Sequence, residues 1–215
     1  MALVHNATLS PSKQELVEPW LPSRSWGSGR KLTGKLAEYR FDDPAGEVGV
    51  ETILWRTDDG AVLQTPLTYR AAPLEAAEAS LIGTTEHSVL GHRWVYDGCG
   101  DPVWAATLSA AIITGGTQAQ VFIDRDGERV EVPARMQVRG NGVGGGSGSG
   151  SVGDLPAVTS IDSVTDEGTV TVVRAGDLEL SLARVVGSSL DGEATLTGRI
   201  GDSGESSLLA SLRRS

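Results

Sequence analysis

Short runs of aliphatic and β-branched residues alternate with turn signals along most of this chain, and this alternation constrains the fold more than any other feature. Such runs at 49–56 and 61–70 flank Asp58-Asp59-Gly60, and runs at 118–124 and 128–132 flank Asp126-Gly127. Asp-Gly suits the tight turns that join antiparallel strands. We therefore predict two β-hairpins, with a further strand near 36–41.

Helix signals are confined to the first two-thirds of the chain. Ser10-Pro11 reads as a cap and first residue of one helix, and Asp101-Pro102 opens a second over 103–114, which Gly115-Gly116 closes. A short helical stretch is expected at 73–80. Residues 155–213 contain only short β-like runs between turns, which predicts an antiparallel meander. The fold class is therefore α+β.

Two segments are expected to depart from regular structure. Pro66 lies inside the second run of the first hairpin, which suggests an edge strand or a bulge. Residues 83–101 are polar and are expected to form a loop, interrupted by Arg93-Trp94-Val95-Tyr96.

The Gly/Ser-rich segment 140–153 divides the chain. We predict an α+β domain over 1–139, a flexible linker or loop over 140–153, and an antiparallel β subdomain over 154–215. The last part forms a separate domain or completes the first sheet. Gly140, Gly142 and Gly145 match a dinucleotide-binding pattern, but no helix can begin after them, so a linker is favoured.

Charge and composition exclude several classes of function. The net charge is −10, with +3 in residues 1–40 and −13 in the rest, which opposes nucleic-acid binding. No apolar run is long enough for a membrane span, the first residues do not resemble a secretory signal, and the single cysteine, Cys99, fits a reducing compartment. We expect a cytoplasmic protein.

The sequence contains no complete catalytic, cofactor or metal motif. Asp124, Asp126, Gly127 and Glu128 resemble part of a calcium loop but lack its remaining ligands. We therefore predict no catalytic residue, no cofactor and no metal ion.

Residues 86–101 form the densest polar cluster. A structured loop is the favoured interpretation, ahead of a binding role, a set of metal ligands that includes Cys99, or a nucleophile–base pair. The candidate contacts for a ligand or partner are Trp26, which we expect to be partly exposed, and four residues of this cluster: His87, His92, Arg93 and Asp97.

A family resemblance appears in an ordered series of short motifs. The run from Val17 to Trp26, VEPWLPSRSW, resembles the opening of the N-terminal cap domain of actinobacterial maltokinases. The segments 41–49, 66–73 and 82–98 resemble stand-alone cap-like proteins of actinobacteria, some of them labelled glucan branching. The resemblance covers roughly residues 10–135 and implies a curved antiparallel sheet with helices packed on it.

The resemblance also indicates a biological setting, α-glucan and trehalose metabolism. A maltokinase needs a kinase-like body with a phosphate-binding lysine, yet no lysine follows Lys35, and the nearest counterpart of the lysine strand, 179–186, has none. The chain also ends where that body would begin. We expect a non-catalytic accessory module that acts with a kinase-like or other partner enzyme, or self-associates. A module that binds a sugar or sugar phosphate is the alternative, and a cryptic kinase or hydrolase is less favoured.

Overall fold

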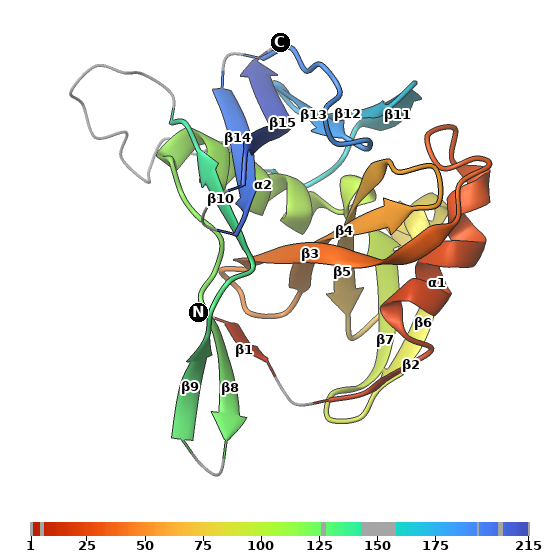
Figure 1. The fold of residues 1–215 in the computed structure, drawn as a ribbon, viewed down its shortest axis with the longest axis vertical. Coiled ribbons are helices and arrows are strands. Elements are labelled where there is room, and N and C mark those ends of the chain that lie inside the picture. Colours follow the sequence, from red (N-terminus) through yellow and green to blue (C-terminus); the bar gives the residue numbers. More distant parts are fainter. Residues whose placement is uncertain are drawn as a thin grey trace.

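Two six-stranded antiparallel sheets make up most of the molecule. A computed structural model describes residues 2–4, 7–125, 128–142, 158–192, 194–201 and 204–214. The first sheet is strongly curled (Figure 1), and its strand order is β2-β6-β7-β5-β4-β3. Its strands are β2 Leu9–Ser10, β3 Leu32–Asp42, β4 Gly49–Thr57, β5 Val62–Arg70, β6 Leu81–His87 and β7 Gly91–Asp97. The hairpin predicted around Asp58-Asp59-Gly60 is confirmed as β4 and β5.

The second sheet has the order β10-β14-β15-β13-β12-β11. Its strands are β10 Met136–Gly140, β11 Ser163–Glu167, β12 Val170–Ala175, β13 Leu178–Ala183, β14 Ala194–Ile200 and β15 Ser206–Arg214. All pairs are antiparallel, but β15 lies between β13 and β14, so the sheet is not a simple meander. β10, which precedes the Gly/Ser segment, joins this sheet rather than the first one.

A small third sheet projects from the body of the molecule (Figure 1). The second predicted hairpin is confirmed as β8 Val121–Arg125 and β9 Glu128–Val132, and β1 Ala2–Val4 pairs in parallel with β8. The turn residues 126 and 127 lie outside the described residues, as does most of the segment 140–153, including Gly145. The calcium-loop and dinucleotide motifs therefore lie partly outside the described chain.

Both predicted α-helices form, and the first begins later than expected. α1 spans Lys13–Trp20, and its N-cap is Ser12, which exchanges hydrogen bonds with Glu15 in a capping box. Ser10, the predicted cap, is instead the last residue of β2. α2 spans Pro102–Thr114 with Asp101 as its cap and Gly115 in the left-handed conformation at its end, as predicted. Three 3₁₀ turns complete the helices: η1 Leu21–Ser23, η2 Glu75–Ser80 and η3 Gly98–Gly100.

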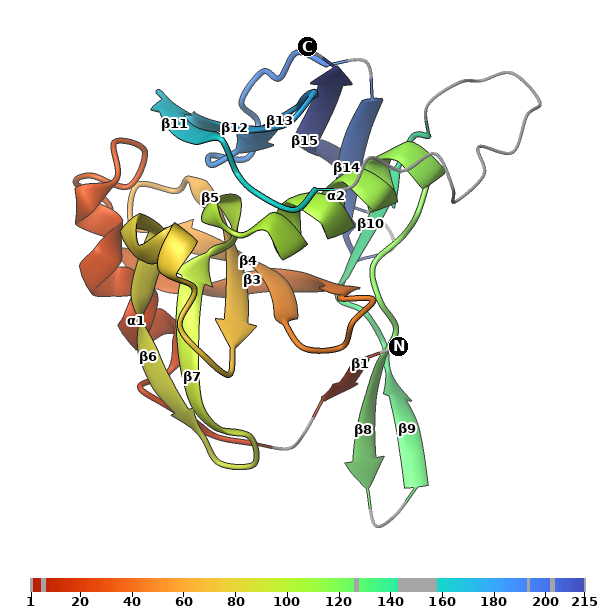
Figure 2. The same cartoon turned by 180° about the vertical axis from the view of Figure 1, so that it is seen from behind.

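The first sheet is buried on both faces, because consecutive residues of its central strands enter different hydrophobic clusters. Ile53 of β4 packs with α1 residues Leu16 and Val17, whereas Leu54 packs with the α2 residue Leu108. The larger cluster also contains Leu180 and other residues of the second sheet. Figure 2 shows α2 running alongside both sheets. The two sheets therefore share one core.

Backbone contacts join the two sheets at one corner. Leu63 of β5 forms a bridge with Val185, and the N–H groups of Gln64 and Val186 donate to Arg184 and Val62 at 2.8 and 2.9 Å. The side-chain amide of Gln64 also donates to the carbonyl oxygens of Ala183 and Leu209, each at 3.0 Å. The division of the chain at 139 and 154 into domains stays a prediction.

Two local predictions were wrong. The segment 83–101 is mostly a hairpin, because β6 pairs with β7, and its turn contains Gly91 with a φ of 73° rather than an Asn-Gly pair. Pro66 lies on an interior strand, since β5 pairs with both β4 and β7. The β7 ladder begins at the next residue, Leu67, so β7 offers no acceptor opposite the proline.

Candidate functional site

A cavity of about 510 Å³ opens beside the buried carboxylate of Glu51, and we call it the Glu51 pocket. It is lined by residues of β3, β4 and β5, of the β3–β4 turn, of the start of α1 and of the β6–β7 hairpin. The side chains that matter for its chemistry are Lys13, Arg40, Asp42, Asp43, Glu47, Glu51, Tyr69, His87 and Arg93.

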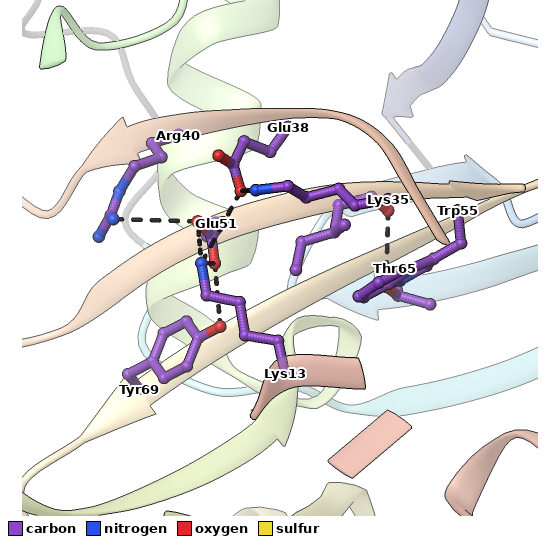
Figure 3. Close-up of polar contacts among 9 residues, drawn as sticks. Lys13, Lys35, Glu38, Arg40, Glu51, Trp55, Thr65 and Tyr69 are labelled. Carbon is purple, nitrogen blue, oxygen red and sulfur yellow. Dashed lines mark hydrogen bonds and ion pairs between the residues drawn. The ribbon is translucent and has the colours of Figure 1, made fainter. Parts of the chain in front are cut away.

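Glu51 is the centre of a network of polar contacts (Figure 3). Its side chain is only 2% exposed. Lys13 Nζ lies 2.7 Å from the carboxylate, and the Tyr69 hydroxyl donates to Oε2 at 2.9 Å. Arg40 Nη1 is 3.9 Å from Oε1, close enough for an ion pair but not for a hydrogen bond. α1, β3 and β5 each bring one partner to this carboxylate.

These neighbours keep Glu51 ionised although it is buried. Burial alone would raise the pKa of its carboxyl, but the charges of Lys13 and Arg40 and the hydrogen bonds from Lys13 and Tyr69 lower it to about 2. The pKa of the Tyr69 hydroxyl is raised well above its ordinary value, by burial first and then by the charge of Glu51. The Tyr69 hydroxyl therefore stays protonated at neutral pH and donates a hydrogen bond to Glu51.

Arg40 has donors to spare. Its Nη1 lies 3.9 Å from Glu51, and its Nε is buried with no hydrogen-bond partner among the described residues. A buried donor without an acceptor is costly, so this guanidinium is suited to an acceptor brought by a ligand. Arg93 of the β6–β7 hairpin also lines the pocket, and it donates from Nη1 to the carbonyl of His92 at 2.7 Å.

The β3–β4 turn lines the pocket, and its conformation is held by hydrogen bonds within the turn itself. The Asp43 carboxylate accepts hydrogen bonds from the backbone N–H groups of Ala45, Glu47 and Val48 at 3.0, 3.0 and 2.9 Å. Gly46 supplies the positive φ of 73° that the turn requires. The turn therefore needs no ligand to order it.

Of the five residues proposed as contacts, the structure brings two to this pocket. His87 and Arg93 line it. His92 lies 2.5 Å from Glu86 and packs edge-on against Trp94 on the surface of the hairpin. Trp26 and Asp97 belong to a different, buried cluster.

Trp26 was predicted to be partly exposed, but it is buried, with 1% of its surface exposed. Its Gly/Ser-rich surroundings suggested a surface loop, yet the Arg184 guanidinium lies 4.6 Å above its ring and Trp20 packs against its edge. Asp97 is buried as well, with its carboxylate 2.6 Å from Arg184 Nη2. Arg184 also donates to the Thr171 hydroxyl at 2.7 Å.

Cys99 lies near this ion pair and is fully buried. Burial, partly offset by the charge of Arg184, raises the pKa of its thiol well above the ordinary value. A protonated, inaccessible thiol is a poor nucleophile. No group of three or more His, Cys, Asp or Glu side chains that could hold a metal ion occurs in the described part of the chain.

The sequence reasoning missed Lys13, Arg40, Glu51 and Tyr69. One signal was present: Glu51 is the one charged residue in the run 49–55, which belongs to a strand that is buried on both faces. A buried carboxylate needs a cationic partner, but Lys13 is 38 positions away, and only the fold brings the two together.

A second cavity of about 560 Å³ runs along α2 and is lined mainly by small side chains, including Ala106, Ala110 and Thr114. Ser109 also lines it, and its buried hydroxyl has no partner among the described residues. It lacks the convergent charged groups of the Glu51 pocket. None of the described helices is both long and apolar enough to cross a membrane.

Comparison with known families agrees with the geometry of the first sheet. No curated protein matches the chain. The family model of the maltokinase N-terminal cap domain matches residues 20–101, which are 82 of the 215 residues and include β3 to β7. The match ends at Asp101, the cap of α2. The predicted resemblance is therefore confirmed: residues 20–101 match the model of the maltokinase N-terminal cap domain.

Proposed function

We propose that this chain is a non-catalytic accessory module that acts with a kinase-like enzyme, or with another enzyme of α-glucan or trehalose metabolism. The observation that carries the proposal is the match of residues 20–101 to a domain named as the N-terminal cap of maltokinase. A cap is by name a part of a larger enzyme, so a protein partner is its natural context.

The lysines of the chain support a role without phosphoryl transfer. Kinases grip the nucleotide phosphates with a strand lysine. The chain has three lysines, none after position 35. Lys13 is paired with the buried Glu51, and Lys35 pairs with Glu38 at 2.8 Å. At the end of β13, in the segment compared with the lysine strand, the cation is Arg184, which is paired with Asp97.

A phosphoryl-transfer assay tests the non-catalytic part of the proposal. The purified chain is incubated with ATP, Mg²⁺ and maltose, and ADP release is followed with a coupled enzyme system. We expect no release above that of a heat-denatured sample. Maltose-dependent ADP production that scales with protein concentration would contradict the proposal.

Affinity capture with quantitative mass spectrometry tests the partner. The tagged chain serves as bait, and a captured enzyme counts only if the purified pair forms a complex in solution. Two bait variants locate the contact: Val89→Asp at the tip of the β6–β7 hairpin, and Val164→Asp on β11 of the second sheet. Both side chains are exposed, at 55% and 41%. An accessory role for the cap predicts that Val89→Asp weakens the complex and Val164→Asp does not.

A further inference from the structure

We infer that β9 is a dimerisation strand, which pairs edge to edge and antiparallel with β9 of a second copy of this chain. This role belongs to the small sheet β1-β8-β9 and is independent of the accessory role proposed above. Three properties of the sheet support it: an open strand edge, an apolar face outside the core, and a strand sequence that is complementary to itself.

The open edge belongs to β9, the outer strand of a sheet that projects from the body of the molecule (Figures 1 and 2). Among the described strands its only neighbour is β8, and the two pair from Val121 and Val132 to Arg125 and Glu128. The backbone groups on the other side of β9 therefore have no strand partner in the described part of the chain. An open strand edge is a template for pairing with another chain.

One face of this sheet carries branched apolar side chains. Val121 and Ile123 of β8 lie opposite Val132 and Val130 of β9, so the four side chains share a face. None of the four belongs to either hydrophobic cluster of the described residues, and Val130 and Val132 are each 36% exposed. Pairing of two β9 strands would place the two copies of Val130 side by side and shield both from water.

The sequence of β9, Glu-Arg-Val-Glu-Val over residues 128–132, favours a second copy as the partner. A twofold axis through an antiparallel strand pair relates each residue to one on the same face, so the axis must pass beside one residue of each strand. With the axis at Val130, Arg129 is opposite Glu131 of the other copy, and the symmetry repeats this pair. Opposite charges in such positions stabilise a strand pair.

Neighbouring registers lack this complementarity. An axis at any of the three charged residues of β9 sets two like charges directly opposite each other, which destabilises a strand pair. An axis at Val132 brings Pro133 into the pair, and a proline has no N–H group to donate. The charge pattern therefore selects the register centred on Val130. A strand of 5 residues makes a small interface, so we expect a weak dimer that dissociates on dilution.

Sedimentation equilibrium on the full chain, over a range of protein concentrations, provides the test. We expect a monomer–dimer equilibrium in the unmodified chain. Arg129→Glu and Glu131→Arg each turn both opposite-charge pairs into like-charge pairs, and each should raise the dissociation constant by about tenfold or more. An equimolar mixture of the two variants should form dimers again, because the glutamates of one variant then lie opposite the arginines of the other.

Glu167→Arg is the matched control. Glu167 is an exposed residue at the end of β11, an edge strand of the second sheet, and its replacement should leave the dissociation constant unchanged. Glu131 is exposed as well and accepts a hydrogen bond from the Gln120 side chain at 3.3 Å, so we expect its variant to fold, which circular dichroism checks. Val130→Asp sets two carboxylates opposite each other at the axis, and it decides the matter if a charge variant fails to fold.

Three results would overturn the inference. The first is an unmodified chain that stays monomeric at every concentration. The second is a folded charge variant, or a folded Val130→Asp variant, that dimerises as tightly as the unmodified chain. The third is a mixture of the two folded charge variants that stays monomeric.

Discussion

At the scale of single residues, two buried carboxylates are held in different ways. Asp97 has one strong cationic partner, Arg184, whose side chain is 1% exposed. Glu51 has two cationic neighbours, Lys13 and Arg40, and also accepts a hydrogen bond from the Tyr69 hydroxyl. A buried charge whose partner is removed loses its compensation and keeps its desolvation cost. The two sites therefore give separate predictions.

Asp97→Asn should destabilise the chain by about 3 kcal/mol or more, because the Arg184 guanidinium would remain buried without a counter-ion. The asparagine keeps an oxygen that can accept from the N–H of Cys99, as Asp97 does, so the loss of charge is the main change. Urea denaturation followed by tryptophan fluorescence measures the difference. Glu38→Gln is the control: its ion pair with Lys35 is well exposed, and we expect a change below about 1 kcal/mol.

Acid should remove the stability that Glu51 contributes. The pKa of this carboxyl is about 2 in the folded chain and 4.5 in its ordinary state. A lowered pKa means that the contribution is complete above about pH 4.5 and is lost as the pH falls toward 2. The free energy of unfolding should therefore fall more steeply between pH 4.5 and 2 in the unmodified chain than in Glu51→Gln. If the free energy of unfolding falls equally steeply with pH in both proteins, the pKa of Glu51 is not lowered by Lys13, Arg40 and Tyr69 as described.

At the scale of elements, local signals in the sequence predict most of the structure. The β4–β5 hairpin and α2 form where turn and cap residues indicate, because Asp-Gly and Asp-Pro act through the adjacent backbone. The β6–β7 hairpin was missed because its polar residues, including Glu86 and His92, lie near its exposed turn and give the strand pair a loop-like composition. Its turn also lacks the usual residue pair.

Features that depend on distant residues could not be predicted in this way. Trp26 is buried by Arg184, 158 positions further along the chain, and no local pattern records that contact. The same holds for the Glu51 pocket, to which the sequence analysis assigned only His87 and Arg93. The placement of β15 between β13 and β14 could not be predicted either, because the strands of this region have similar sequences and several pairings are compatible with them.

The contact between α2 and β10 depends on Gly140. This glycine is part of the dinucleotide-binding pattern noted in the sequence, but its role in the structure is to allow close packing. A Cβ atom on Gly140 would lie 2.0 Å from the carbonyl oxygen of Ala111 and 2.7 Å from the Cα of Ile112. Gly140→Ala should therefore force the strand away from the helix and destabilise the chain by about 1–3 kcal/mol or more. Thermal unfolding measures the effect. Gly168→Asn is the control, since Gly168 has open space around it and asparagine tolerates its positive φ. Equal melting temperatures for Gly140→Ala and the unmodified chain would contradict the packing.

At the scale of the whole molecule, the shared core predicts that both sheets unfold together. Leu54 of the first sheet and Leu180 of the second are fully buried members of one cluster. Leu54→Ala and Leu180→Ala should each lower the stability of a single transition by about 2–5 kcal/mol. Coincident fluorescence and circular dichroism curves would support a single cooperative unit. Two separated transitions, with each variant shifting only one, would instead support the division into domains.

The corner where Val62 and Gln64 meet Val186 and Arg184 has a practical consequence for anyone who isolates the cap. In the full chain, the backbone of β5 is hydrogen-bonded to Arg184 and Val186, directly after β13, and the Gln64 amide to β13 and β15. In a fragment limited to residues 20–101, residues 62–64 of β5 would lose these partners on the side away from β4. The apolar face of the first sheet that packs against α2 and the second sheet would also be exposed. Exposed strand edges pair with other chains, so such a fragment should aggregate unless residues from the second sheet are retained.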